Sequence, residues 1–279
     1  VFGTSSKKHP KIERIWKQGD FLISGARMRF LRKVEFNDGM DQYRKTPEEI
    51  YQECKSKGAD AIYAFQVRNP LHGGHVFLLQ DARLQLIAKG YKNPVLVLHP
   101  CGGWSKDDDI PLEYRMRQHQ ILLDEGTLDP QTTVLAIWPS PMYLAGPTEV
   151  VWHAYSRVNC GVTHFITGRD PAGITHPEER DTQETKAPLY DPWHGQKLLV
   201  LLQARLNIEI IPFKVAALNK HTKKMEFIDH KKDPKLYEDL SGGRVKKLAQ
   251  ASQEPPKGIM SKECWDVLRE YYSKNKSKK

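Results

Sequence analysis

The sequence predicts an α/β fold built on a doubly wound parallel sheet. Between residues 59 and 213, five short runs rich in Val, Ile and Phe alternate with segments long enough to be helices. This alternation is typical of a parallel sheet whose strands are buried on both faces. The five runs are ADAIYAF, PVLVLHP, TTVLAIWP, THFITG and IEIIPF. Such sheets bind ligands beyond the carboxyl ends of their strands, where the strand order reverses, so the segments that follow the strands are the first to inspect.

The segments on either side of this region have a different pattern. Residues 20–34 contain two short extended runs around Gly25, a hairpin that needs a larger sheet to be stable. After residue 229 the chain becomes more polar, with helices expected in SGGRVKKLAQASQ and SKECWDVLREYYSKN. We therefore expect a remnant of an N-terminal β domain over residues 1–49, the α/β domain over residues 50–229, and a small C-terminal α+β subdomain over residues 230–279.

Two local patterns add detail. In KTPEEIYQECKSKG, Thr46 is placed to cap a helix, Glu49 to complete a capping box, and Gly58 to end the helix. The polar stretch over residues 177–191 lies between the fourth strand and its helix. We interpret it as a mobile excursion or lid.

Composition limits the classes of function. Lys and Arg total 43 against 34 Asp and Glu, a net charge of +9, which favours an anionic partner such as a nucleotide or sulfate. No stretch approaches the roughly 18 to 20 apolar residues of a membrane span, and no basic motif interleaved with aromatic residues suggests RNA binding. We expect neither membrane nor nucleic acid as a partner. The four cysteines lie far apart in the sequence, which favours the cytoplasm, with the nucleus as the alternative.

The strongest chemical signal is QVRNPLHGGH at residues 66–75, directly after the first strand. It places His72 and His75 near the first turn of a helix, whose positive end binds phosphate groups readily. Glycines there let the backbone come close to a ligand. Histidines in this position can donate hydrogen bonds as charge develops on a phosphate. Zinc shared by the two histidines is a weaker interpretation, because the HExxH glutamate and a third ligand are absent from the sequence. We predict no protein-bound metal site.

The pattern QxRNPxHxxH resembles the signature of the ATP sulfurylase family. Further blocks in the same order extend the resemblance: GWSKDDDIPL at residues 103–112, SPMYLAGPTEV at residues 140–150 and GRDPAG at residues 168–173. The sequence is most similar to the sulfurylase part of the animal-type bifunctional PAPS synthases. The resemblance implies an HxGH nucleotidyltransferase domain with a Rossmann-like sheet, a barrel-like domain before it and a small domain after it. The implied reaction joins sulfate to the α-phosphate of ATP, giving adenylyl sulfate (APS) and pyrophosphate.

By this resemblance, the first motif divides between the two substrates. Gln66 and Arg68 hold sulfate, and the planar, permanently charged fork of Arg68 suits a tetrahedral oxyanion. Asn69, His72 and His75 contact the phosphates of ATP, and Val67 contributes its backbone N–H. The residues expected to act in catalysis are Val67, Arg68, Asn69, His72 and His75.

Two later segments complete the expected site. The backbone of Gly168, Arg169, Asp170 and Pro171 frames the nucleotide, and the N–H of Ala172 completes the sulfate pocket. Without the resemblance, GRDPAG would be an ordinary turn. Ala216, after the fifth strand, borders the adenine. The full set expected to bind ATP is Gln66, Val67, Arg68, Asn69, His72, His75, Gly168, Arg169, Asp170, Pro171 and Ala216.

The remaining expectations concern cofactors, partners and alternatives. Mg²⁺ arrives with ATP, and Asp107, Asp108 and Asp109 either tune its shell or form loop surface. No organic cofactor is expected. No GxxxxGK[ST] string occurs, so any APS kinase domain lies upstream in a parent chain, and a homodimer is expected. The enzymatic alternative is an HxGH adenylyltransferase acting on another acceptor. A nucleotide sensor or nucleic-acid binder is the non-catalytic alternative, supported only by the net charge.

Overall fold

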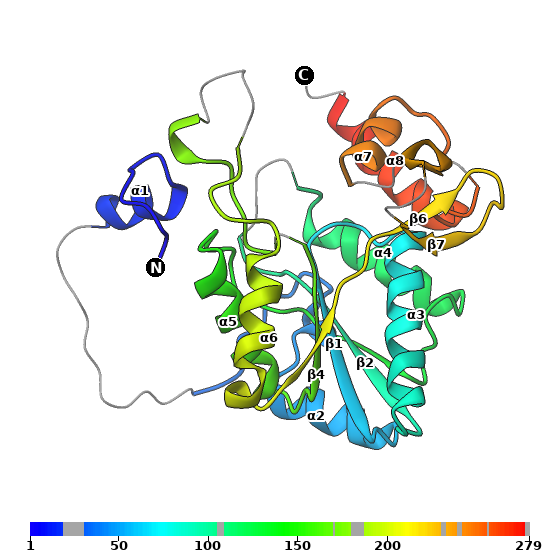
Figure 1. Cartoon of the computed structure of the whole chain (residues 1–279), viewed down its shortest axis with the longest axis horizontal. Coiled ribbons are helices and arrows are strands. Elements are labelled where there is room, and N and C mark those ends of the chain that lie inside the picture. The colour runs from blue at the N-terminus through cyan, green and yellow to red at the C-terminus, as the bar shows by residue number, and fades with distance from the viewer. Residues whose placement is uncertain are drawn as a thin grey trace.

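The computed structural model describes residues 1–18, 31–104, 109–169, 171–179, 187–229, 233–238, 242–255 and 257–276. Its centre is a five-stranded parallel sheet in the order β3-β2-β1-β4-β5 (Figure 1). The strands are β1 Ala61–Val67, β2 Pro94–Pro100, β3 Thr133–Leu135, β4 His164–Thr167 and β5 Glu209–Pro212. The predicted parallel α/β sheet is therefore confirmed. The strand order reverses between β1 and β4, which are hydrogen-bonded neighbours.

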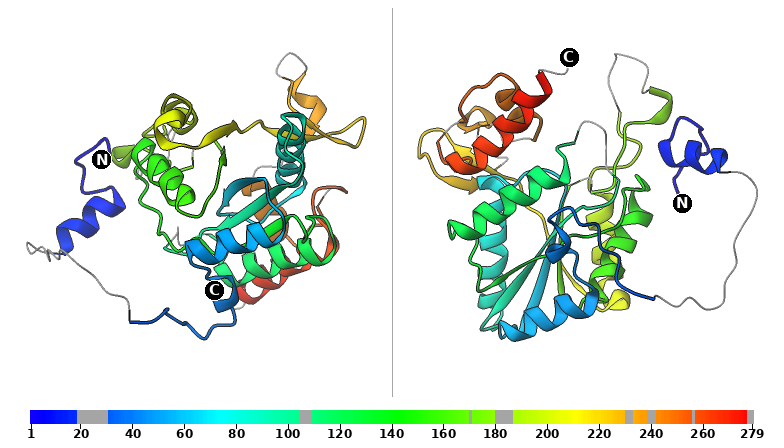
Figure 2. Two further views of the ribbon diagram at one scale, coloured as in Figure 1. Left: turned by 90° about the horizontal axis from the view of Figure 1, so that it is seen from below. Right: turned by 180° about the vertical axis from the view of Figure 1, so that it is seen from behind.

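Helices cover both faces of the sheet (Figures 1 and 2). Alternate residues of β1 explain why, because side chains along a strand point to opposite faces. Tyr63 and Phe65 belong to one core cluster, with buried residues of the helices α3 and α4, whereas Ile62 and Ala64 belong to a second cluster with α2, α5 and α6. These helices are α2 Pro47–Ser56, α3 Gly73–Ala88, α4 Leu112–Asp124, α5 Pro147–Val158 and α6 His194–Leu206.

The predicted start and end of α2 are confirmed. The Thr46 hydroxyl accepts from the Glu49 backbone N–H at 3.2 Å, and the Glu49 carboxylate accepts from the Thr46 N–H at 2.6 Å. Both N–H groups would otherwise lack a partner at the helix start. Gly58 follows the helix with a φ of +75°, a conformation that glycine adopts without strain.

The C-terminal part forms a second, smaller layer against α3 and α4. Its three antiparallel strands have the order β7-β6-β8, and their bounds are β6 Ala216–Asn219, β7 Met225–Phe227 and β8 Tyr237–Glu238. A 3₁₀ turn, η3 Pro234–Leu236, precedes the helices α7 Gly242–Gln250 and α8 Lys262–Lys276. Trp265 and Leu268 of α8 are buried with Val245 of α7 and with Ile110, which precedes α4. Because β6 begins before residue 229, this sheet draws strands from both sides of that position.

The N-terminal segment lies over the loop that precedes α5. It contains α1 Pro10–Lys17, and a 3₁₀ turn, η1 Asp41–Tyr43, lies further along the chain. The buried His9 ring places Nε2 3.0 Å from the Leu144 carbonyl, and the Tyr190 hydroxyl lies 2.7 Å from the Phe2 carbonyl, to which it donates. The predicted hairpin over residues 20–34 falls mostly outside the described residues, and residues 31–34 contain no strand.

The predicted lid is only partly described. A 3₁₀ turn, η2 Pro177–Glu179, precedes residues 180–186, which lie outside the described part of the chain. Thr175 and Pro188 form a bridge on either side of them. Within the described residues, no helix is both long enough and apolar enough to cross a membrane. All four cysteines are buried as free thiols.

Candidate anion and nucleotide site

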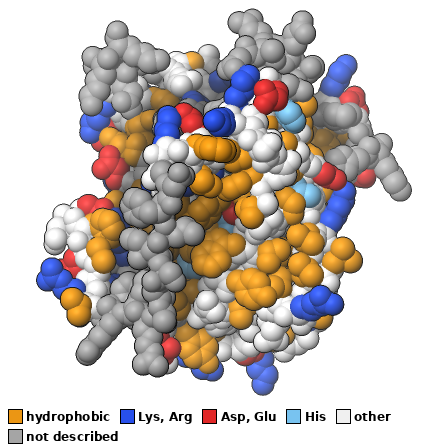
Figure 3. Space-filling model, turned by 90° about the vertical axis from the view of Figure 1, so that its left-hand side faces the viewer, with side chains coloured by type: hydrophobic (Ala, Val, Ile, Leu, Met, Phe, Trp, Pro, Cys, Tyr) orange, Lys and Arg blue, Asp and Glu red, His pale blue; other side chains and the backbone are white. Residues whose placement is uncertain are grey.

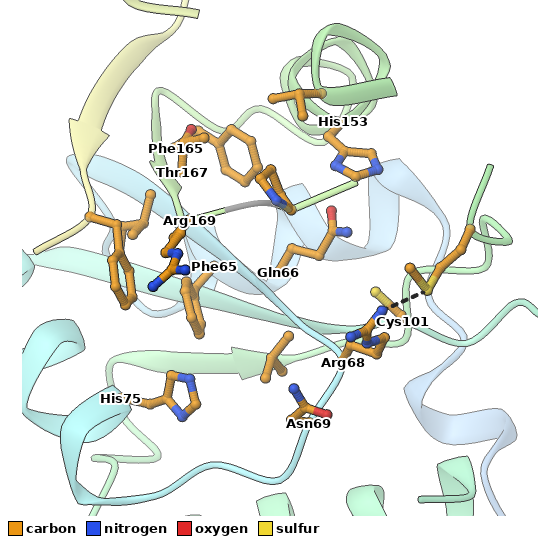
Figure 4. Close-up of a pocket in the computed structure, with 17 residues that line it drawn as sticks. Phe65, Gln66, Arg68, Asn69, His75, Cys101, His153, Phe165, Thr167 and Arg169 are labelled. Atoms are coloured by element: carbon orange, nitrogen blue, oxygen red, sulfur yellow. Dashed lines mark hydrogen bonds between the residues drawn. The ribbon is translucent and has the colours of Figure 1, made fainter. Parts of the chain in front are cut away.

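A cavity of about 210 Å³ lies where the strand order reverses (Figure 4). The segments after β1 and β4 both face it, because the carboxyl ends of these neighbouring parallel strands meet at one edge of the sheet. Most of the residues predicted from the two motifs line this cavity: Gln66, Val67, Arg68, Asn69, His75, Gly168, Arg169 and Pro171. Asp170, also predicted, lies outside the described residues. Ligand pockets typically measure about 300 to 1,000 Å³, so a whole nucleotide would extend beyond the cavity.

Three predicted residues do not line the cavity but lie next to its wall. His72 faces a neighbouring hollow, beside Val76 and Met260. The Ala216 carbonyl would lie 3.3 Å from a Cβ placed on Gly74, so Ala216 borders the start of α3. Ala172 is fully buried, and its carbonyl accepts from the Gly146 N–H at 3.1 Å.

The two motif histidines cap the start of α3 for each other. The His72 backbone N–H donates to His75 Nδ1 at 3.4 Å, and the Gly74 N–H donates to His72 Nδ1 at 3.2 Å. Their ring centroids are 3.9 Å apart. Burial lowers the pKa of His72 to about 4 and the pKa of His75 well below its usual value. Both rings are therefore neutral at pH 7. Because each Nδ1 accepts a hydrogen bond, each proton is on Nε2, and each ring has one N–H to donate.

The glycines of this motif approach protein backbone as well as the cavity region. The Gly73 N–H donates to the Ile259 carbonyl at 2.6 Å, and a Cβ on Gly73 would lie 2.6 Å from the Gly258 carbonyl oxygen. One N–H at the start of α3 is thus used to dock the C-terminal part. The glycines were expected to let the backbone come close to a ligand. In the structure a protein segment, residues 258–259, comes close to Gly73, and the sequence motif alone did not reveal this.

Arg68 is held by two contacts from outside its own motif. Its Nε lies 3.4 Å from the Asp109 carboxylate, whose side chain is 9% exposed. Its Nη1 donates to the Met142 sulfur at 3.4 Å (Figure 4). Asp109 is therefore largely buried against Arg68 and is not exposed loop surface, although it does not line the cavity. Asp107 and Asp108 lie outside the described residues.

Several residues of the cavity were missed by sequence reasoning. They are Phe65, Cys101, Met142, Val150, His153, Phe165, Ile166, Thr167 and Phe213. Cys101 follows β2 directly, so the rule that ligands bind at strand ends would have found it. His153 lies on α5, just after the block SPMYLAGPTEV, and no local pattern marks it.

The loop that carries Met142 is anchored by a buried carboxylate. Glu149 is 3% exposed, and its oxygens accept from the N–H groups of Tyr143 at 2.9 Å and Ala145 at 3.0 Å. The pKa of Glu149 is lowered: burial acts to raise it, but His153 and the two backbone N–H groups outweigh burial. Leu144 has a φ of +57°, a strained conformation that persists only where surrounding contacts hold it. The loop is thus fixed against the cavity.

The charges of the cavity favour an anion. Two guanidinium groups, Arg68 and Arg169, line it, and no described lining residue is a carboxylate. Within the described residues, no group of three or more His, Cys, Asp or Glu side chains is arranged to hold a metal ion. Together with the two neutral histidine donors, this arrangement can bind oxyanions and stabilise charge on them.

The fold and the cavity define a doubly wound α/β protein with a cavity lined by two guanidinium groups at its topological switch point. A family model described as ATP-sulfurylase matches residues 41–271, and the chain belongs to the ATP sulfurylase family. It is similar to two Arabidopsis thaliana proteins: "ATP sulfurylase 4, chloroplastic", 46% identical, with 98% of this chain and 56% of the relative covered, and "ATP sulfurylase 2", 44% identical, with the same coverage. The chain thus spans about half the length of these relatives.

More distant comparisons agree with this family and with the fold. A "Sulfate adenylyltransferase" from Halothermothrix orenii is 30% identical, with 96% of this chain and 65% of the relative covered. Among solved structures, a hexameric APS kinase from Thiobacillus denitrificans matches with a TM-score of 0.59 and 18% identity, covering 85% of this chain and 41% of that one. At that identity the likeness concerns the fold alone.

Proposed function

We propose that this chain catalyses sulfate adenylyl transfer, in which ATP and sulfate give APS and pyrophosphate. The observation that carries the proposal is that Gln66, Arg68 and His75 line one cavity, in a chain of the ATP sulfurylase family. One end of the motif supplies a charged fork for an oxyanion, and the other supplies N–H donors at a helix start.

Sulfate is a dianion at neutral pH, so its in-line attack on the α-phosphorus needs no general base. The chain must instead hold two anions together against their repulsion, by positioning and by electrostatic stabilisation. We propose that Gln66, Arg68 and the Ala172 N–H hold sulfate. Asn69 and the Nε2–H groups of His72 and His75 then bind the phosphates. Val67, Gly168, Arg169, Asp170 and Pro171 frame the nucleotide, and Ala216 borders the adenine.

We propose that Mg²⁺ enters as part of the Mg–ATP substrate. The donor set supports this, because the described lining residues offer nitrogen donors and no carboxylate, whereas Mg²⁺ in proteins prefers oxygen ligands and usually stays bound to substrate phosphates. No organic cofactor is proposed. Titration calorimetry should find that Mg²⁺ alone binds far more weakly than Mg²⁺ in the presence of ATP.

The test of the proposed reaction compares acceptors. Pyrophosphate release from Mg–ATP is measured with sulfate and, separately, with phosphorylated organic acceptors and with none. Release that depends on sulfate, and on Arg68, supports the proposal. Release that depends only on an organic acceptor would support the alternative HxGH adenylyltransferase, and ATP binding without any turnover would indicate a nucleotide sensor.

The wider assembly is also a proposal. We infer a homodimer, supported by exposed hydrophobic side chains gathered on the face that carries α5 and α6 (Figure 3). They are Trp152, Tyr155, Val200 and Leu201, and large exposed apolar patches commonly mark interfaces. Sedimentation should give a dimer that Leu201→Glu shifts toward the monomer.

We propose that residues 1–49 are a remnant of a preceding β domain and that residues 230–279 form a C-terminal subdomain.

We propose that an APS kinase domain lies upstream in a parent chain, which would give the protein a place in PAPS synthesis. Sequencing the reading frame before residue 1 tests this. We propose a cytoplasmic location, with the nucleus as the alternative. One relative is named chloroplastic, so a plastid is the competing compartment. Imaging of a fluorescent fusion of the full reading frame distinguishes them.

A further inference from the structure

A buried arginine lies behind the wall of the cavity. Arg157 on α5 is 0% exposed, with its guanidinium carbon 3.9 Å from the ring centroid of Trp138 and 5.4 Å from that of Phe165. Its Nη1 donates to the His153 carbonyl and to the Ser156 hydroxyl, both at 3.1 Å. Within the described part of the chain, its Nε and Nη2 have no hydrogen-bond partner and no carboxylate forms an ion pair with it.

Burying this cation carries an energetic cost. Burying a cation is costly unless a partner of opposite charge and hydrogen bonds compensate it. Burial lowers the pKa of Arg157 to about 9, so the group still carries its charge at pH 7. Glu149, the buried carboxylate on the same helix, is already engaged by the Tyr143 and Ala145 N–H groups and lies 3.4 Å from His153. His153 is itself neutral, because burial lowers its pKa.

The charge of Arg157 lies close to the cavity. Phe165 and His153 both line the cavity and both lie against Arg157. Arg157 also acts on Cys101 in the cavity wall. Burial raises the pKa of the Cys101 thiol, and the positive charge of Arg157 offsets part of this rise. Figure 4 shows His153, Gln66 and Cys101 on the side of Arg68, away from His75. Gln66 Oε1 is also buried there without a described partner. The part of the cavity nearest to Arg157 is therefore the part proposed for sulfate.

We infer that Arg157 is an electrostatic positioning residue for the sulfate subsite, whose missing counter-ion is the bound oxyanion. This inference rests on the proposed function, because it takes the anion in that part of the cavity to be sulfate. Aromatic and buried groups separate the two charges, and an electrostatic interaction through such a medium is stronger than through water. The anion thus offsets the cost of burying Arg157, and Arg157 strengthens the binding of the anion without touching it.

The test combines stability with anion binding in Arg157→Met, which keeps an unbranched side chain between the two rings and removes the charge. Arg205→Met on α6 is the matched control, because Arg205 is exposed. Thermal unfolding is followed in millimolar sodium sulfate against sodium chloride at equal ionic strength. The KM for sulfate, the KM for ATP and kcat are then measured separately. Arg157→Lys, which keeps a charge but not the fork, is the second variant.

We expect Arg157→Met to fold with unchanged or higher stability in chloride and to lose most of the stabilisation by sulfate. Its KM for sulfate should rise at least about tenfold, equivalent to about 1.4 kcal/mol, with smaller changes in the KM for ATP. Arg157→Lys should keep part of the sulfate response, and Arg205→Met all of it.

Three results would overturn the inference: loss of folding in chloride with Arg157→Met, an unchanged sulfate response in that variant, or no sulfate response in the wild type. Failure of the proposed function has a different signature. The wild type would then bind sulfate, in a manner that depends on Arg157, but would release no pyrophosphate with it.

Discussion

Arg68 Nε lies 3.4 Å from the Asp109 carboxylate. The guanidinium proposed to bind sulfate is therefore already paired with an internal anion. This pairing can orient the fork, but it also places a negative charge beside the subsite for a dianion. The two effects act on different kinetic constants, which makes them separable.

Asp109→Asn removes the charge and keeps the shape of the side chain. We expect the KM for sulfate to fall by up to about fivefold, in line with the about 0.2 to 1 kcal/mol of exposed ion pairs, because one competitor for the guanidinium is gone. The value of kcat should fall, since Arg68 is less well oriented. Asp266→Asn on α8, half exposed, is the control. A rise in the KM for sulfate would show that Asp109 assists anion binding.

Arg68→Ala should abolish sulfate-dependent pyrophosphate release while ATP binding changes little. The loss should be at least about 10²- to 10³-fold, the usual effect of removing one donor to a developing oxyanion. Arg68→Lys keeps the charge without the fork and should recover only part of the activity. Steady-state kinetics measures the loss of turnover, and calorimetry measures whether ATP binding is kept. Near-normal turnover in Arg68→Ala would contradict the assignment.

His72→Ala and His75→Ala should lower kcat more than they raise the KM for ATP. The neutral rings each offer an Nε2–H, and donors of this kind act mainly on the transition state. His75→Gln places an amide N–H near the position of Nε2, so it should retain more activity than His75→Asn, whose amide lies near the position of Nδ1. Equal activities of the Gln and Asn variants would argue against Nε2 as the donor.

Gly73→Ala should destabilise the protein by roughly 1 to 3 kcal/mol, the usual cost of overpacking. The added Cβ would lie 2.6 Å from the Gly258 carbonyl oxygen, so the C-terminal segment must move. Gly168→Ala is the comparison, because a Cβ there meets no atom within 4 Å. Its free energy of unfolding in urea should stay within about 0.5 kcal/mol of the wild type. A stable Gly73→Ala protein would mean that the 258–259 segment yields easily.

The buried histidines predict how stability depends on pH. Burial lowers the pKa of His119 to about 3, and its ring is 0% exposed. Between pH 6.5 and pH 3 the unfolded chain binds a proton at this residue and the folded chain does not. The free energy of unfolding should therefore fall as the pH falls through this range, by about 1.4 kcal/mol per pH unit for each such proton. The measurement is the free energy of unfolding in urea at pH 7, 6 and 5. In His119→Leu this free energy should fall less steeply with falling pH, by the contribution of one proton.

Much of the sheet and part of the site could be predicted locally. The runs of apolar residues at β1, β2, β4 and β5 needed no distant information, because a strand buried on both faces must be apolar throughout. The predicted capping box of Thr46 and Glu49 involves residues only three apart in the sequence. Gln66, Arg68 and Arg169 all line one cavity, since strand ends in such a fold converge on one edge.

What the sequence by itself determined is the strand and helix alternation and the chemical character of the two motifs, because both depend on residues close together in the chain. Tertiary structure alone decided the rest. It brought Asp109 and Met142 to Arg68, docked the Ile259 carbonyl on Gly73, and buried Arg157 behind the cavity with no counter-ion among the described residues. These contacts join residues up to about two hundred positions apart. Which polar residues meet is set by the hydrophobic packing of helices onto the sheet, and this packing is not specific for any one polar pair.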